Sequence, residues 1–271
     1  MTVLAPPSDV LRRNHVVESG RPDGRPLVFM HGFGCSQETW RFVTPRFVDD
    51  YRVIVFDHVG SGRSDWSAYD FARYDSLHSY ADDLLEILET LDLHDVVLVA
   101  HSVSAMMAVL ATNQDRSRIG GLVLVGPSPR YIDAAGYQGG FSQSDIDGLL
   151  DSLDANYLGW SSAMAPVIIG NPDRPELAVE LTSSFCRCDP AIAAHFARVT
   201  FLSDNRRDLP QVQVRTLLLQ ASEDAIAPVA VGRYLQRTIP GSEMVVMSAT
   251  GHLPHLSAPD EVAGQLRAFL G

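Results

Sequence analysis

The sequence predicts an α/β fold: a mostly parallel, doubly wound sheet carrying a lid of about four helices. Short apolar runs alternate with stretches of helical periodicity, as they do where parallel strands are joined by crossover helices. This alternation stops between about residues 130 and 207, where helical patterns continue without a convincing strand run. We therefore predict a core of residues 1–129 and 208–271, with a helical lid of residues 130–207 inserted in it.

Six apolar runs have the length and composition of strands that are buried on both faces of a sheet. They lie at residues 27–30, 52–56, 96–100, 122–125, 216–220 and 244–247. Residues 14–18 precede them and predict an antiparallel edge strand. Together these segments indicate a single sheet that uses both ends of the chain.

Helical spacing is clearest in residues 80–91, where leucines recur on one face, and residues 103–112 and 229–238 are further helix candidates. In the lid, breakers such as Gly170-Asn171-Pro172 separate the helical stretches. The lid helices are expected at 143–157, 160–169, 175–187 and 190–202. A lid over the ends of the strands is where a substrate pocket would lie.

Composition argues against several classes of function. All 21 basic residues are arginine, and 33 acidic residues give a formal net charge of -12 at pH 7, so nucleic acid is not expected as a partner. Without a lysine, Schiff-base chemistry is excluded. Residues 1–7 do not have the pattern of a secretory signal, and no run approaches the ~18 apolar residues of a membrane span. The three cysteines fit a reducing compartment. We expect a cytoplasmic protein without cofactor, metal site or membrane contact.

Ser102 is the candidate nucleophile. It follows one predicted strand directly and precedes a predicted helix, in Ala100-His101-Ser102-Val103-Ser104. A sharp turn between strand and helix lifts a serine hydroxyl above the sheet, provided that its neighbours are small. Ala100 and Ser104 replace the two glycines of the usual motif, and both are small. Ala100 is expected to tilt the turn and slow turnover.

His252 is the candidate general base, because it follows the strand 244–247 and titrates in the range that proton transfer requires. His255 competes for this role, although it lies closer to the start of a helix. Asp224 follows the strand 216–220 and would orient the imidazole, with Glu223 as its rival.

The order Ser102, Asp224, His252 is the order found in α/β-hydrolases, and each residue follows a different strand at the carboxyl edge of the sheet. The segment His31-Gly32-Phe33-Gly34 follows the first core strand. In this fold the loop after that strand supplies one N–H group to the oxyanion, and the residue after the nucleophile supplies the other. Phe33 and Val103 are therefore the predicted oxyanion donors.

Five segments form a recognisable set: 31–35 (HGFGC), 56–62 (FDHVGSG), 101–106 (HSVSAM), 125–130 (VGPSPR) and 251–256 (GHLPHL). Together they resemble the RsbQ-type bacterial α/β-hydrolases and their plant relatives, the strigolactone and karrikin receptor hydrolases. The resemblance covers nearly the whole chain, and residues 171–176 and 185–186 lean toward the bacterial branch.

The resemblance implies a small hydrophobic pocket under the lid and hydrolysis of an ester, enol ether or lactone through an acyl-enzyme, with a role in signalling. Met164 stands where the plant receptors tend to carry an aromatic residue, so their ligand preference does not transfer. The alternative is a ligand-dependent regulator of a stress-response phosphatase, with slow or no turnover. The implied pocket residues are Phe33, Tyr131, Phe141, Trp160, Met164 and Phe201.

Overall fold

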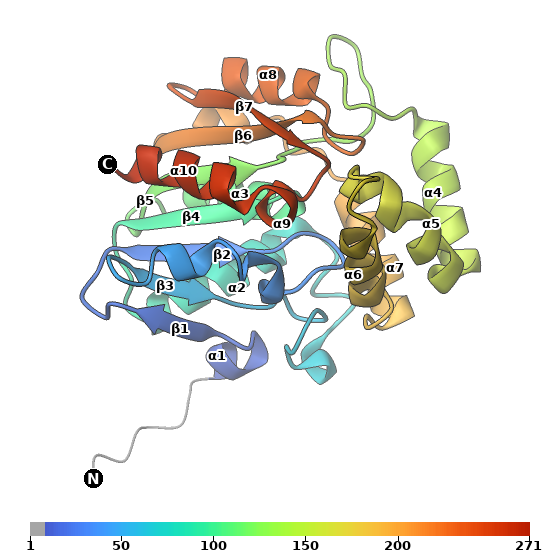
Figure 1. Ribbon diagram of the computed structural model, residues 1–271. Coiled ribbons are helices and arrows are strands. Elements are labelled where there is room, and N and C mark those ends of the chain that lie inside the picture. The colour runs from blue at the N-terminus through green and yellow to red at the C-terminus, as the bar shows by residue number, and fades with distance from the viewer. Residues whose placement is uncertain (1–8) are drawn as a thin grey trace.

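Seven strands form one sheet in the order β1-β3-β2-β4-β5-β6-β7 (Figure 1). The computed structural model describes residues 9–271, so the interpretation of residues 1–7 lies outside the described part of the chain. Strand β1 pairs antiparallel with β3, and every other neighbouring pair is parallel. The predicted fold, a mostly parallel α/β sheet, is confirmed.

The strands follow the predicted apolar runs, and most extend them by one to three residues at one or both ends. The run 244–247 was wrongly predicted to be buried on both faces, because β7 is an edge strand of the sheet and Val246 is exposed. All six residues of β4 are buried, which explains why this run is apolar throughout. The edge strand begins later than predicted, because residues 14–16 form the turn after α1 and His15 has a φ of 44°. The strands are β1 Val17–Gly20, β2 Pro26–Met30, β3 Arg52–Val55, β4 Val96–His101, β5 Ile119–Val125, β6 Arg215–Glu223 and β7 Glu243–Thr250.

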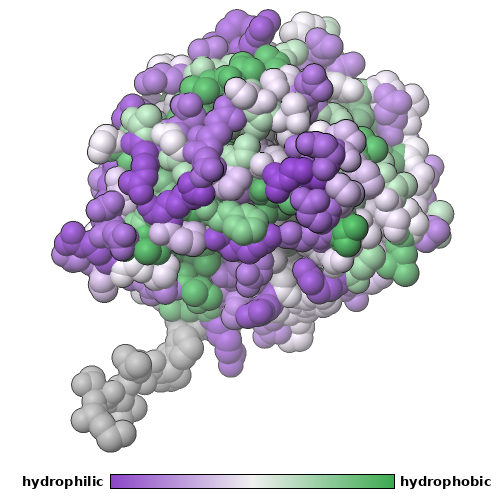
Figure 2. All heavy atoms as spheres, in the orientation of Figure 1, coloured by the Kyte–Doolittle hydropathy of each residue, from purple (hydrophilic) through white to green (hydrophobic). Residues whose placement is uncertain are grey.

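Helices cover both faces of the sheet. Apolar side chains of α2, α3 and α8 pack on one face, whereas α10 and Trp40 pack on the other. No helix among residues 9–271 is long and apolar enough to cross a membrane. Figure 2 shows one face of the molecule, where hydrophilic residues predominate and hydrophobic residues form small patches. The core helices are α1 Asp9–Arg13, α2 Leu77–Thr90, α3 Val103–Gln114, α8 Val229–Thr238, α9 Pro254–Ser257 and α10 Pro259–Leu270.

Four helices between β5 and β6 lie together beyond the carboxyl ends of the strands (Figure 1). Asn156 separates the first two, because its side chain accepts a hydrogen bond from the N–H group of Gly159 and caps the second helix. The second helix ends at Gly170, which has a φ of 60°. Apolar faces of these helices form a cluster of their own with Leu253 and Leu256. The four are α4 Gln143–Ala155, α5 Tyr157–Ile169, α6 Pro175–Phe185 and α7 Pro190–Phe201.

Candidate active site

Ser102 occupies a strained turn between β4 and α3. Its φ of 56° and ψ of -123° place a residue with a side chain in a backbone region that favours glycine. The N–H group of Ser102 donates to the carbonyl of Val125, 2.9 Å away, and so ties the turn to β5. Such strain costs on the order of 1–3 kcal/mol and persists where the surrounding structure enforces it. This is the sharp turn that the sequence predicts.

A chain of hydrogen bonds joins Ser102, His252 and Asp224. His252 Nε2 lies 2.7 Å from Ser102 Oγ, and His252 Nδ1 lies 2.8 Å from Asp224 Oδ2. The side chains of His252 and Asp224 are 6% and 1% exposed. Because a carboxylate only accepts, Nδ1 carries the imidazole proton and leaves Nε2 free to accept from the hydroxyl. The arrangement allows a proton to pass from Ser102 to His252.

The carboxylate of Asp224 is held from two sides. Its Oδ1 accepts from the N–H groups of Ile226 and Ala227, at 2.8 and 3.0 Å, while Oδ2 faces His252. The backbone after β6 therefore fixes the rotamer of Asp224. Glu223, the rival in the sequence, is exposed, and its backbone carbonyl accepts from the N–H group of Gly251.

His255, the rival base, is fully buried in α9 and stacks on Trp40, with ring centroids 4.3 Å apart. Neither ring nitrogen has a hydrogen-bond partner within the described residues. Burial lowers the pKa of His255 to about 3, with the neighbouring His252 as a secondary cause. His255 thus packs as a neutral ring, while the structure brings His252 to the hydroxyl.

The loop that carries Phe33 lies directly against the turn at Ser102. A Cβ on Gly32 would stand 2.6 Å from His101 Nδ1 and 3.2 Å from Ser102 Cβ, so only glycine allows this approach. Val103 is the first residue of α3, where backbone N–H groups have no partner inside the helix. The two predicted donors thus lie on segments that meet beside Ser102, and their role stays a prediction.

Buried histidines support this loop. The N–H group of His58 donates to His31 Nε2 at 3.1 Å, which leaves His31 Nδ1 to donate to the carbonyl of Gly32 at 2.9 Å. Burial lowers the pKa of His31 and of His58, so both rings are neutral donors and acceptors. Ser104 also joins this group, with its hydroxyl 2.7 Å from His58 Nε2. The second glycine of the usual motif is therefore replaced by a residue whose hydroxyl is satisfied.

Sequence reasoning assigned no role to His58 or His101. His101 Nε2 donates to the backbone carbonyl of His252 at 2.8 Å. A signal was present, because His31, His58 and His101 each stand at or just after the end of a strand, where a parallel sheet gathers its site.

An apolar cavity opens beside Ser102 and His252. Of the predicted pocket residues, Phe33, Tyr131, Trp160 and Phe201 line it. The volume open to the centres of water-sized spheres is about 30 Å³, so the space is narrow. Phe141 and Met164 do not line the cavity, but are partly buried against the same hydrophobic cluster. Lining residues that sequence reasoning missed include Ile168, Leu181 and Phe185, of which the last two recur with Leu177 at helical spacing on α6.

Three buried polar atoms of this lining have no hydrogen-bond partner within residues 9–271. Two can donate, Trp160 Nε1 and Thr200 Oγ1, and the third is the acceptor nitrogen His101 Nδ1. A buried donor without a partner is unfavourable by about 1–3 kcal/mol. A ligand with acceptor oxygens would satisfy the two donors. Burial raises the pKa of Tyr131, and the nearby Ser102 hydroxyl opposes that shift in part.

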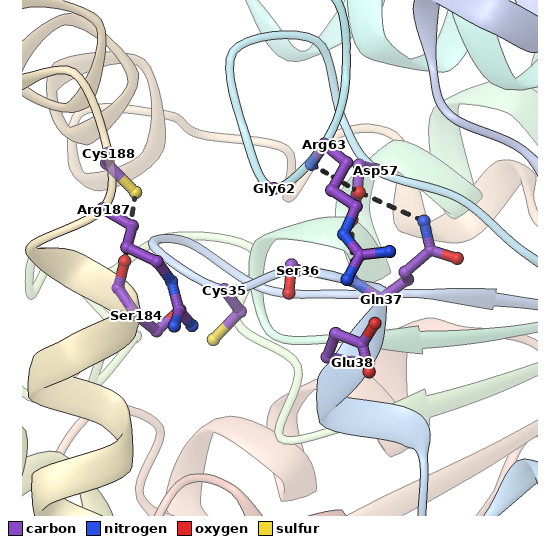
Figure 3. Close-up of a pocket in the computed structure, with 10 residues that line it drawn as sticks. All are labelled: Cys35, Ser36, Gln37, Glu38, Asp57, Gly62, Arg63, Ser184, Arg187 and Cys188. Carbon is purple, nitrogen blue, oxygen red and sulfur yellow. Dashed lines mark hydrogen bonds between the residues drawn. The ribbon is translucent and has the colours of Figure 1, made fainter.

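Figure 3 shows the residues that line a second pocket, among them Cys35 and Asp57. This pocket has a volume of about 250 Å³ and shares Cys35 with the cavity beside Ser102. Asp57 is satisfied there by the backbone and side-chain N–H groups of Gln37 and by the N–H group of Arg63. Burial raises the pKa of the Cys35 thiol to about 12, so this sulfur is a poor nucleophile. This pocket offers no nucleophile paired with a base. Within the described residues, no group of three or more His, Cys, Asp or Glu side chains is arranged to hold a metal ion.

Comparison with known proteins gives consistent findings. A family model described as the alpha/beta hydrolase family matches residues 27–265. The chain is 40% identical over 238 residues to the Karrikin insensitive 2 receptor CA of Petunia hybrida, covering 87% of this chain and 88% of the relative. It is 38% identical over 246 residues to the strigolactone esterase RMS3 of Pisum sativum, covering 90% and 92%. A solved structure of a hydrolase from Oleispira antarctica superposes with a TM-score of 0.94 at 38% identity, covering 97% of this chain and 96% of that one.

Proposed function

The chain belongs to the alpha/beta hydrolase family, and from this premise we propose that it is a serine hydrolase with Ser102 as nucleophile, His252 as general base and Asp224 as the orienting acid. The observation that carries the proposal is the unbroken hydrogen-bond chain between these three side chains. The strained backbone of Ser102 supports it as well, because strain of this kind clusters at functional sites.

The reaction would follow the usual course of acyl transfer. Ser102 Oγ attacks the carbonyl carbon as its proton passes to His252 Nε2, and Asp224 stabilises the imidazolium that forms. The N–H groups of Phe33 and Val103 donate to the tetrahedral oxyanion. His252 then protonates the leaving oxygen, which yields an acyl-enzyme. A water molecule that His252 deprotonates hydrolyses this ester and restores the serine.

The substrate class we propose is a small hydrophobic ester, enol ether or lactone. The narrow apolar cavity selects for small apolar groups, while Trp160 Nε1 and Thr200 Oγ1 favour a molecule with acceptor oxygens. The name of one relative, a strigolactone esterase, agrees with this class. Residues 130–207, which include α4–α7, would act as the lid that closes over the bound substrate.

A second candidate is a ligand-dependent regulator of the RsbQ type that acts on a stress-response phosphatase and turns over slowly or not at all. The relatives named as karrikin receptors favour a signalling role. This candidate would be supported by a ligand that shifts the melting temperature of the protein persistently but is barely hydrolysed. Hydrolysis of the ligand at many turnovers per minute would favour the hydrolase alone.

The test is labelling with a fluorophosphonate together with turnover of short p-nitrophenyl esters. We expect the wild type to be labelled, and Ser102→Ala to lose both labelling and turnover, the latter by on the order of 10⁶ in kcat. Ser104→Ala is the matched control, since it removes a neighbouring hydroxyl and should still be labelled. Labelling that survives in Ser102→Ala, or a wild type that is neither labelled nor active, would overturn the proposal.

A further inference from the structure

Both the backbone N–H group and the backbone carbonyl of His252 are hydrogen-bonded to other segments of the protein. Its N–H group donates to the carbonyl of Ile168, in the last turn of α5, at 2.8 Å. Its carbonyl accepts from His101 Nε2, also at 2.8 Å. The backbone of His252 is therefore tied to α5 on one side and to the turn that carries Ser102 on the other.

Asn171 fastens the end of α5 to the loop that carries His252. Its Nδ2 donates to the carbonyl of Ile169 at 2.6 Å and to that of Thr250 at 3.0 Å. The last carbonyls of a helix have no partner inside it, so one side-chain amide satisfies a helix end and a strand end together. The hydroxyl of Thr250 reaches back to the carbonyl of Gly170 at 3.4 Å.

The end of α5 and the loop before His252 approach each other more closely than side chains at Gly170 and Gly251 would allow. Gly251 has a φ of 81°, and a Cβ on it would stand 1.7 Å from the carbonyl oxygen of Ile169. Gly170 has a φ of 60°, and a Cβ there would stand 2.9 Å from Gly251 Cα. Both glycines are therefore required where the end of α5 meets the loop before His252.

We propose that the carboxyl end of α5, fastened by Asn171, sets the position of His252 relative to Ser102, so that Asn171 is a positioning residue for the reaction. The inference rests on the proposed hydrolysis. Proton transfer needs the 2.7 Å contact between His252 Nε2 and Ser102 Oγ, and a misplacement of about 1 Å can cost roughly 100-fold in rate. Asn171 is not among the residues that line the cavity, so its effect falls on kcat and not on KM.

The test compares Asn171→Asp and Asn171→Ala with Asn156→Asp. Asn171→Asp turns the donor toward Ile169 and Thr250 into a carboxylate oxygen that repels both carbonyls. Asn156→Asp makes the same change in charge at the opposite end of α5, where the side-chain oxygen already acts as an acceptor. We expect kcat for a p-nitrophenyl ester to fall about 10- to 100-fold in Asn171→Asp, and less in Asn171→Ala, with KM within about twofold. Asn156→Asp should match the wild type.

The melting temperature of each variant separates positioning from folding. If kcat falls while the melting temperature and KM stay near the wild-type values, the inference holds. A kcat of Asn171→Ala within twofold of that of Asn156→Asp overturns it, as does a loss of activity in strict proportion to the folded fraction. A wild type without labelling or turnover would instead refute the proposed hydrolysis itself.

Discussion

The two oxygens of Asp224 have different partners, and that division gives a test at the scale of one residue. Oδ1 accepts from backbone N–H groups and Oδ2 from His252. In Asp224→Asn the amide nitrogen would face His252 Nδ1, which favours the wrong tautomer. We expect kcat to fall on the order of 10⁴-fold, as in other triads with this change. The measurement is steady-state turnover of a p-nitrophenyl ester.

Glu223→Gln is the matched control, because it makes the same change at the adjacent, exposed carboxylate. It should leave kcat and KM near the wild-type values. Equal losses in the two variants would contradict the assignment of Asp224.

The residues of the hydrogen-bond chain could be found from the sequence because each follows a strand whose apolar run is easy to see. Ser102, Asp224 and His252 therefore gather at one edge of the sheet. The contact of His101 with the carbonyl of His252 could not be found, since it joins positions 151 residues apart and leaves no local pattern. The separation of Phe141 and Met164 from the cavity likewise depends on how α4 and α5 pack.

At the scale of the elements, helix α4 contains a glycine at a position where the structure leaves room for a side chain. Gly148 lies inside this helix, and a Cβ there would have no atom within 4 Å. Gly148→Ala should raise the free energy of unfolding by about 0.5–1 kcal/mol, because alanine loses less backbone entropy in a helix. Urea unfolding measures this difference.

Gly251→Ala is the contrasting variant, since its φ of 81° and its contact with Ile169 exclude a Cβ. It should be destabilised by more than about 1 kcal/mol. A neutral Gly251→Ala would mean that the loop before His252 can move away from α5.

Ends of helices were predictable where side chains mark them. Gly170 ends α5, and Pro175 and Pro190 begin α6 and α7 as expected. The predicted break between α4 and α5 lies about two residues too late. The actual break is at Asn156, which caps α5, and the spacing of apolar residues does not reveal a cap. The predicted start of the edge strand at residue 14 was three residues too early, because the turn at His15 has a positive φ that the sequence does not reveal.

At the scale of the whole molecule, buried histidines make stability depend on pH. Burial lowers the pKa of four of them, His31, His58, His101 and His255, below the ordinary value near 6.5. The unfolded chain therefore binds more protons than the folded one as the pH falls. The stability that comes from keeping these rings neutral is fully present above about pH 6.5, the pKa of histidine in the unfolded chain. It is lost as the pH falls below that value toward the folded-state pKa, which is about 3 for His255.

Urea unfolding at pH 7.5 and at pH 5 should thus show a lower free energy of unfolding at pH 5. His255→Phe keeps a ring on Trp40 and removes one titrating group, so its pH slope should be shallower by at most about 1.4 kcal/mol per pH unit. An unchanged slope would mean that His255 is protonated in the folded state.

The overall architecture was predictable because both faces of the sheet are covered, which gives its central strands recognisable apolar runs. The lateral order of the strands was not, since β2 pairs with both β3 and β4 and these contacts join distant parts of the chain.

Strands β5 and β6 pair directly with each other, from Gly121 opposite Arg215 to Val125 opposite Leu219, although α4–α7 lie between them in the sequence. The sheet's hydrogen bonds are therefore complete without those helices. Over evolution, this segment can be reshaped while the reacting groups are inherited unchanged, as long as the carboxyl end of α5 keeps its contacts with His252 and Thr250. Proteins of this architecture can therefore differ in the molecules they bind while they keep the same reacting groups.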